Sequence, residues 1–248
     1  MNIFRYDGTQ NGFFTVVFEI YTKKLLPETI TSSEDIQLAL DGCIFEISTD
    51  EEKSDRIKNG IIKHIGKEGL RSFKYAFASC DKEKEMKMFS YIRLIFKHGN
   101  NVLHMLSLPG VIEYNLLVAR VKTEIEHIKG FMRFSQLSSG VFLGEYTPDN
   151  DITDLLMPFF VERHSDMDFI IFDKNRNKMG MYNKQEFTLI CCDQKIPEIF
   201  TEEEACFQSL WQQYFETASI SSRKNKRLQD RFLSNRYRRN MTEFSSKR

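Results

Sequence analysis

The spacing of apolar side chains changes near residue 129, and this change constrains the fold more than any other feature of the sequence. Before it, apolar residues recur three and four positions apart, as in helices that bury one side. After it, short apolar runs separated by turn-forming residues predict β-strands. The sequence therefore predicts one α+β unit of 248 residues, with a soft division between a mainly helical part, 1–129, and a β-rich part, 130–248.

The N-terminal part is expected to be helical apart from one short strand at residues 43–48. Thr49 or Asp50 can cap the helix that follows this strand, and Gly99 is a suitable residue to end a helix. The predicted helices cover residues 11–26, 50–64, 70–79, 83–97 and 109–128.

The C-terminal part is expected to hold a mostly antiparallel sheet and to end in two helices, the last of them basic. The predicted strands cover 130–134, 140–146, 168–172, 178–182 and 186–191, with a helix at 152–164. Thr201 to Glu204 form a capping box, which predicts a helix start. That helix is expected to be strongly amphipathic, and the residues of its apolar side are Cys206, Leu210, Trp211, Tyr214, Phe215 and Ala218.

Charge is distributed unevenly, although the chain has 35 basic and 35 acidic side chains. Residues 223–248 contain 10 Lys or Arg and 2 acidic residues, a net charge of +8, so the remaining residues carry −8. A basic end on an acidic body indicates a polyanion or an acidic protein surface as the partner.

The basic end is predicted to form a helix with Arg223, Arg227 and Arg231 on one face. Leu228 and Phe232 form a neighbouring apolar stripe that can dock this helix on the body. The predicted nucleic-acid-binding residues are Arg223, Lys224, Arg227, Arg231, Arg236 and Arg239 for phosphate, with Tyr237 as a stacking group. The alternative is a solvated helix, or arginines paired with the protein's own acidic side chains.

Few residues suggest catalysis. Glu124 and His127 form one ExxH pair, whereas carboxylate-bridged di-iron sites need two such pairs and two further carboxylates. A structural role at the end of a helix is therefore favoured for this pair, and no metal site is predicted. Asp168, with Asp166 and Asp173, flanks a predicted strand and could act in acid–base chemistry, but turn formation is the commoner role. The catalytic residues stay unknown, and Glu124, His127 and Asp168 are weak candidates.

Several functional classes lose support from absent motifs. The chain has no GxGxxG, GxxxxGK[ST], GxSxG or HExxH motif and no CxxC pair among its 5 Cys. No apolar stretch approaches the roughly 20 residues that span a bilayer, and no secretory signal is evident. We therefore expect reduced thiols, no membrane association and a cytoplasmic location.

Motifs along nearly the whole chain resemble a bacterial domain family of unknown biochemical function, usually labelled "probable DNA metabolism protein". No single motif is specific, but their combination is. The residues that carry the resemblance are Tyr6-Asp7-Gly8, Gly12-Phe13, Thr49-Asp50, Ala76-Phe77, Tyr91-Ile92-Arg93, Phe96, Gly99, Glu124, His127, Gly130-Phe131-Met132-Arg133-Phe134, 158–163, Asp168-Phe169, Ile171, Asp173, Trp211, Tyr214, Ile220, Arg223, Asn225, Arg227, Gln229 and Arg236-Tyr237.

The resemblance implies a role in DNA repair or modification. Family members are fused to uracil-DNA glycosylase-like domains or occur beside a radical S-adenosylmethionine protein thought to act on DNA. This chain would be the stand-alone form, so an iron–sulfur cluster and S-adenosylmethionine would belong to a partner and no cofactor is expected here. The expected function is an accessory protein that binds DNA phosphates. The alternatives are an enzyme, glycosylase-like or nuclease-like and using Glu124, His127 or the Asp166–Asp173 cluster near Arg133, or a protein-interaction module that does not touch DNA.

Overall fold

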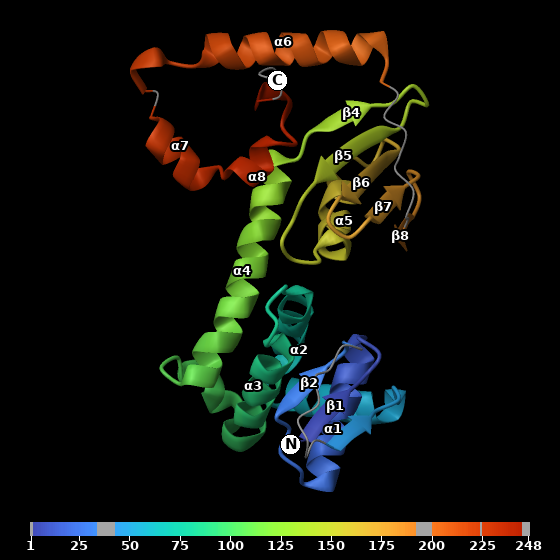
Figure 1. Cartoon of the computed structure of the whole chain (residues 1–248), viewed down its shortest axis with the longest axis vertical. Helices are drawn as coiled ribbons and strands as arrows, with labels where there is room; N and C mark the ends of the chain where they lie inside the picture. Colours follow the sequence, from blue (N-terminus) through green and yellow to red (C-terminus); the bar gives the residue numbers. More distant parts are fainter. Residues whose placement is uncertain (1, 34–42, 192–199, 224, 245–248) are drawn as a thin grey trace. The chain divides into compact units, whose positions relative to one another are not determined.

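The structure, a computed structural model, describes residues 2–33, 43–191, 200–223 and 225–244 (Figure 1). It has the α+β architecture that the sequence predicts, with helices dominating the N-terminal half and a sheet in the C-terminal half. The chain divides into two compact units, unit 1 (Met1–Lys122) and unit 2 (Thr123–Arg248). The boundary falls within one long helix, a few residues before the division that the sequence suggests.

Unit 1 is a small parallel sheet with helices packed around it. The order of its elements is β1 (Asn2–Arg5), α1 (Gln10–Lys23), β2 (Thr29–Thr31), β3 (Cys43–Glu46), α2 (Glu51–Ala78), α3 (Lys84–His98), the 3-10 helix η1 (Gly99–His104) and the first part of α4 (Pro109–Phe131). As predicted, Asp50 caps α2, since its side chain accepts a hydrogen bond from the backbone N–H of Lys53.

The parallel sheet was not predicted, because only β3 was expected as a strand. Its order is β2-β1-β3, and β1 pairs in parallel with both neighbours. Helix α1 crosses between β1 and β2, which is the usual connection between parallel strands. Both missed strands are very short, with four and three residues, too few to show a strand period.

Aromatic and aliphatic side chains of the helices fill the core of unit 1. Tyr91 on α3 and Tyr114 on α4 stack with ring centroids 4.0 Å apart. The Tyr114 hydroxyl lies 2.5 Å from the hydroxyl of Ser72 on α2, so its polar end has a partner inside the core. The largest fully buried side chains of this unit include Phe4, Phe13, Ile61, Met88, Ile92 and Ile95.

Helix α2 is interrupted at Gly66, whose backbone angles are φ 74° and ψ 175°. This region of backbone space is almost exclusive to glycine. The sequence predicts two helices here, ending at 64 and starting at 70, and the interruption lies between them.

Unit 2 contains a five-stranded mixed sheet, one helix packed on it and a helical C-terminal segment (Figure 1). Its elements, after the end of α4, are β4 (Phe134–Gln136), β5 (Phe142–Tyr146), α5 (Thr153–Arg163), β6 (Phe169–Asp173), β7 (Lys178–Tyr182), β8 (Phe187–Cys191), α6 (Glu202–Ala218), η2 (Ser221–Arg223), α7 (Lys226–Phe232), α8 (Asn235–Arg238) and η3 (Thr242–Phe244).

The sheet of unit 2 confirms the predicted, mostly antiparallel arrangement. The strand order is β4-β5-β6-β7-β8, and the β5–β6 pair alone among these is parallel because α5 connects those two strands. Helix α5 packs against β6 and β7, where Gly180 leaves room for Met157: a Cβ on Gly180 would lie too close to the Met157 sulfur. The first strand of this sheet was predicted at 130–134 but lies at Phe134–Gln136, because Gly130 and Phe131 still belong to α4.

Helix α6 starts at the predicted cap, since Thr201 accepts a hydrogen bond from the N–H of Glu204. The helix is amphipathic as predicted, but several side chains of its apolar side are exposed. Leu210, Trp211 and Tyr214 are 55%, 41% and 61% exposed, and Phe207 is 68% exposed. The helical period of apolar residues predicted the helix correctly, but it does not show whether a partner surface exists in the same chain.

Candidate functional site

Glu124, on α4, supports the loop between β5 and α5. Its Oε1 accepts a hydrogen bond from the backbone N–H of Asp149 at 2.9 Å. Its Oε2 accepts two from Asn150, from the backbone N–H at 2.9 Å and from the side-chain amide at 2.7 Å. The residue is only 3% exposed. Both oxygens are therefore used inside the protein, which leaves little capacity to bind a substrate or a metal ion.

Arg236, on α8, is predicted to bind phosphate but turns inward to this carboxylate. Its Nη2 lies 3.0 Å from Glu124 Oε1 and donates a hydrogen bond to the Tyr237 hydroxyl at 2.6 Å. Its Nη1 pairs with the carboxylate of Asp149. The guanidinium is thus held between two acidic side chains, and it attaches the basic segment to α4 within unit 2.

Tyr237 and His127 are packed together beside this ion pair. Tyr237 is 4% exposed, and its ring centroid lies 5.7 Å from that of His127 and 5.6 Å from that of Phe131. Burial raises the pKa of the Tyr237 hydroxyl, although the hydrogen bond from Arg236 opposes this shift. A stacking platform for a base must present a ring face to solvent. The buried ring of Tyr237 does not meet this requirement.

The aspartates near β6 form turns and ion pairs. The carboxylate of Asp168 lies 3.3 Å from Lys184 Nζ. Asp173 is fully buried; its Oδ1 accepts a hydrogen bond from the N–H of Asn175, and its Oδ2 lies 3.0 Å from Arg176 Nη1. Burial raises the pKa of Asp173, while the hydrogen bonds from Arg176 and Asn175 oppose the rise. These contacts favour the structural role for both aspartates.

Arg133, expected near these acidic groups, binds elsewhere. Its Nη2 lies 2.7 Å from Glu243 Oε1, and its Nε donates to Glu243 Oε2 at 3.3 Å. The indole N–H of Trp211 donates to the same Oε2 at 3.2 Å. Arg133 therefore connects the end of α4 to α6 and η3.

The expectation of one continuous basic helix through Arg223, Arg227 and Arg231 is wrong. Arg223 ends η2, whereas the other two lie on α7. The break occurs because Asn225 caps α7: its Oδ1 accepts a hydrogen bond from the N–H of Leu228 at 3.0 Å. Lys224, also predicted to bind phosphate, lies outside the described residues.

Some of the basic side chains are exposed and make no ion pair with a described residue. Among the residues that the structure describes, none of these makes an ion pair, whereas Arg236 pairs with Glu124 and Asp149 and Arg238 pairs with Asp230 at 2.7 Å. The exposed set, called here the free cations, consists of Arg223, Lys226, Arg227, Arg231 and Arg239. The structure therefore separates the basic segment into anchoring and free groups.

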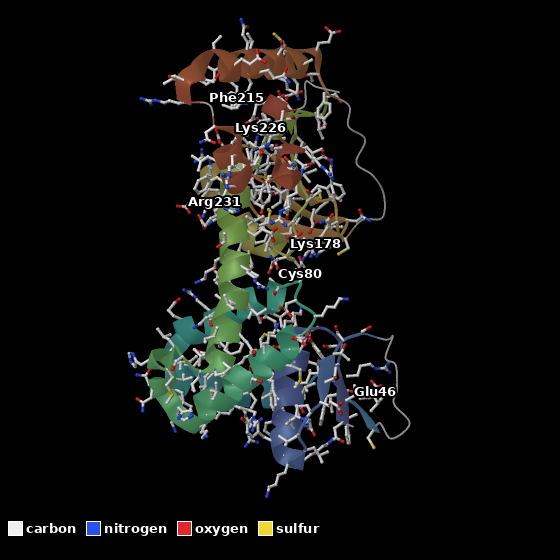
Figure 2. The ribbon with its side chains drawn as sticks, turned by 60° about the vertical axis from the view of Figure 1, so that its left-hand side comes forward. Glu46, Cys80, Lys178, Phe215, Lys226 and Arg231 are labelled. Carbon is white, nitrogen blue, oxygen red and sulfur yellow. The ribbon has the colours of Figure 1, made fainter. Side chains whose placement is uncertain are left out.

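A groove of about 730 Å³ lies beside the free cations, between α6 and the elements that follow it. Phe215 and Lys226, labelled in Figure 2, line it from α6 and α7 respectively. The predicted stripe of Leu228 and Phe232 does not dock on the body; these side chains are 49% and 65% exposed and line the groove. The stripe is visible in the sequence, but its place in the groove is not, because Phe215 and Phe244, which also line the groove, are distant from the stripe in sequence.

The α+β fold and the basic surface define a class of domain rather than an activity. The family called domain of unknown function, DUF4130, matches residues 82–243. The chain therefore belongs to this family, whose match covers unit 2 up to η3 and part of unit 1. No curated protein matches the chain.

No group of three or more His, Cys, Asp or Glu side chains is arranged to hold a metal ion within the described part of the chain. In the same part, no single helix combines the length and apolar character needed to cross a membrane. The helical segments 84–104 and 109–131, which are bent by 74° relative to each other, have this length and apolar character only when they are counted together.

Proposed function

We propose that the protein binds nucleic-acid phosphates through its free cations and acts as an accessory protein in DNA repair or modification, together with a separate enzyme. One observation carries this proposal: Arg223, Arg227 and Arg231 are exposed and make no ion pair with any described residue. Guanidinium groups bind phosphate oxygens strongly, and cations without an internal partner are available for them.

The anchoring groups strengthen the proposal. Arg236 and Arg133 hold the segment to the rest of unit 2 through Glu124 and Glu243. The free cations are thus attached to a fixed support rather than to a loose tail, which reduces the entropy lost on binding.

The electrostatic size of the surface gives a measurable expectation. If all five free cations contact phosphates, the logarithm of the affinity for a single strand falls with the logarithm of salt concentration with a slope of about −3.5, at about −0.7 per phosphate. Arg236 and Tyr237 are not expected to contribute directly, because their side chains bind inside the protein.

The test is a salt titration of binding to fluorescent oligonucleotides, single-stranded and duplex, followed by anisotropy. The triple variant Arg223→Gln, Arg227→Gln, Arg231→Gln should weaken binding to both, because three phosphate contacts are lost. The slope should fall by about 2 for the single strand and by about 3 for the duplex. The matched control changes three exposed lysines of unit 1, Lys24, Lys63 and Lys82, to Gln. Equal loss in both variants, or no binding by the native protein at low salt, would overturn the proposal.

A second candidate is a protein-interaction module, which the exposed apolar side of α6 favours. Phe207, Leu210 and Tyr214 are more than half exposed, and exposed apolar side chains on one helix are typical of protein interfaces. On this alternative, Leu210→Asp should abolish co-purification with a radical S-adenosylmethionine partner protein, and the native protein should not bind oligonucleotides even at low salt. The enzyme alternative gains nothing from Glu124, whose oxygens are both occupied.

A further inference from the structure

The two edges of the sheet in unit 2 differ. The edge at β4 is covered, since the backbone N–H of Gln136 donates to Glu204 Oε2 at 3.0 Å and Leu137 forms a β-bridge with Phe200. Strand β8 (Phe187–Cys191) forms the opposite edge (Figure 1), and within the described residues it pairs with β7 alone. Among the described residues, the backbone beyond β7 is therefore not covered by a further strand.

Strand β8 lacks the features that protect a sheet edge. All of its residues are exposed, and Phe187, Leu189 and Ile190 are 41%, 38% and 41% exposed. Proteins usually protect an edge strand by a charged side chain, a proline or a β-bulge. The strand contains no charged residue and no proline, and its register with β7 is continuous, without a bulge. It is therefore suited to pair with another strand.

The turn before β8 determines which of its backbone groups point outward. The backbone N–H of Asn183 donates to the carbonyl of Glu186 at 3.3 Å. In an antiparallel pair the direction of the backbone groups alternates along the strand. Thr188 and Ile190 therefore bond to β7. The residues whose N–H and C=O groups point away from β7 are Phe187, Leu189 and Cys191.

A second copy of the chain is the partner that this strand favours. Around a twofold axis, residues near the axis lie opposite their own copies, so a charged side chain there would meet a like charge. The absence of charge in β8 removes this obstacle. An antiparallel pair centred on Leu189 also places outward groups opposite outward groups, because Leu189 meets Leu189 of the second copy and Phe187 meets Cys191 of the second copy. A shift by one residue would break this match.

We propose that two copies of the chain associate through β8, so that the sheets of both copies join across a twofold axis. This inference goes beyond the proposed function and does not depend on it, because none of the free cations lies on β8. A strand of five residues is about 17 Å long. Its pairing alone is a small interface compared with the roughly 800 Å² per partner of stable complexes, so the dimer is reversible and depends on concentration.

The first experiment measures the mass of the full chain by sedimentation velocity, from low to high micromolar concentration in reducing buffer. The native protein should shift from monomer to dimer. Leu189→Lys should weaken association about fivefold, because two ammonium groups then lie opposite each other at the axis. The matched control is Met181→Lys, which changes an equally exposed residue, also 38%, on β7 rather than on the edge strand. It should leave the association unchanged.

A second experiment tests the register and does not depend on the stability of the lysine variant. Leu189→Cys is made in a background in which the 5 native cysteines are serine. Opposite residues of a hydrogen-bonded antiparallel pair have Cα atoms about 5.5 Å apart, which suits a disulfide. Mild oxidation should therefore link residue 189 to residue 189 of the second copy, as mass spectrometry can show. Met181→Cys in the same background should not form this link.

Other outcomes would overturn the inference. A native protein that stays monomeric at every concentration would show that β8 does not bind a second copy. Equal association of the two lysine variants, with no link at residue 189, would place any dimer contact elsewhere. A dimer that Leu210→Asp abolishes and Leu189→Lys leaves intact would place the contact on α6 and reject β8. Circular dichroism checks that each variant is folded.

Discussion

The Nη2 atom of Arg236 lies 3.0 Å from Oε1 of Glu124, and this ion pair decides how the basic segment can be used. It directs one guanidinium into unit 2 and leaves its neighbour Arg239 exposed. Glu124, which the ExxH pattern marked as a weak catalytic candidate, is thus the acceptor for the basic segment and for the loop at Asp149 and Asn150.

Replacing Glu124 by Gln should lower the free energy of unfolding by about 2–4 kcal/mol, because an amide group then faces N–H donors and Arg236 loses its buried partner. The matched change is Glu126→Gln on the same helix. Glu126 pairs with Lys129, and its side chain is 69% exposed, so a change within about 0.5 kcal/mol is expected. Urea denaturation measures both; similar values for the two variants would show that the Glu124 contacts contribute little.

Sequence reasoning could not separate Arg236 from Arg239. Both lie in the same run of basic residues, and the feature that distinguishes them is Glu124, which is distant in sequence and reaches Arg236 only in the folded chain. The break before α7 is different, because Asn225 three residues before Leu228 is a recognisable cap. The spacing of the arginines favours a continuous helix, but the cap formed by Asn225 starts a new helix instead.

Trp211, the single Trp of the chain, provides a spectroscopic probe of the contact between Arg133 and Glu243. Its indole N–H donates to Glu243, whose carboxylate also binds Arg133. Glu243→Gln should shift the tryptophan emission maximum at neutral pH, because the charge that holds the indole and the guanidinium together is lost. An emission spectrum identical to that of the native protein would show that this contact does not hold Trp211.

The same contact predicts a pH dependence. Burial raises the pKa of Glu243, but the hydrogen bonds and charge of Arg133 outweigh it and hold the pKa below the ordinary value of 4.5. A carboxylate with a lowered pKa stabilises the fold above its ordinary pKa, and this contribution is lost as the pH falls through the lowered value. The emission maximum of the native protein should therefore stay constant from pH 8 to below 4.5 and change only at lower pH.

The pair Glu85 and Tyr6 in unit 1 should have the opposite pH dependence. Tyr6 donates a hydrogen bond to Glu85 Oε1 at 3.2 Å, and Glu85 is 7% exposed. Burial raises the pKa of Glu85. The folded state therefore binds this proton more tightly than the unfolded state, and Glu85 reduces stability as the pH rises from 4.5 through the raised pKa.

Glu85→Gln keeps an oxygen that accepts from Tyr6 but removes the charge. It should raise the melting temperature at pH 7 and leave it nearly unchanged at pH 4, where the native carboxyl is protonated. Thermal unfolding across this pH range gives the measurement, and the difference between variant and native protein isolates Glu85 from the other carboxylates. A variant that is less stable at pH 7 would mean that the ionised form is favoured in the folded protein.

The short parallel strands of unit 1 show a different limit of sequence reasoning. β1 and β2 have too few residues to reveal an alternating pattern, and their pairing depends on the crossover of α1. The helices around them were predictable because each buries a periodic face over three or more turns. The same contrast applies to the groove beside the free cations: Leu228 and Phe232 have an apolar signal in the sequence, but their proximity to Phe215 and Phe244 is visible only in three dimensions.

The interruption of α2 gives a prediction in which the same substitution has opposite effects at two positions. Gly66 has φ 74°, which an alanine adopts only with strain, and a Cβ there would meet no atom within 4 Å. Gly66→Ala should therefore lower the free energy of unfolding by about 1–3 kcal/mol through backbone strain alone. Gly130 also has open space around its Cβ position but lies within helix α4, so Gly130→Ala should raise stability by up to about 1 kcal/mol. Urea denaturation of both variants measures the two signs, and a stabilising Gly66→Ala would show that α2 runs through residue 66 without a break.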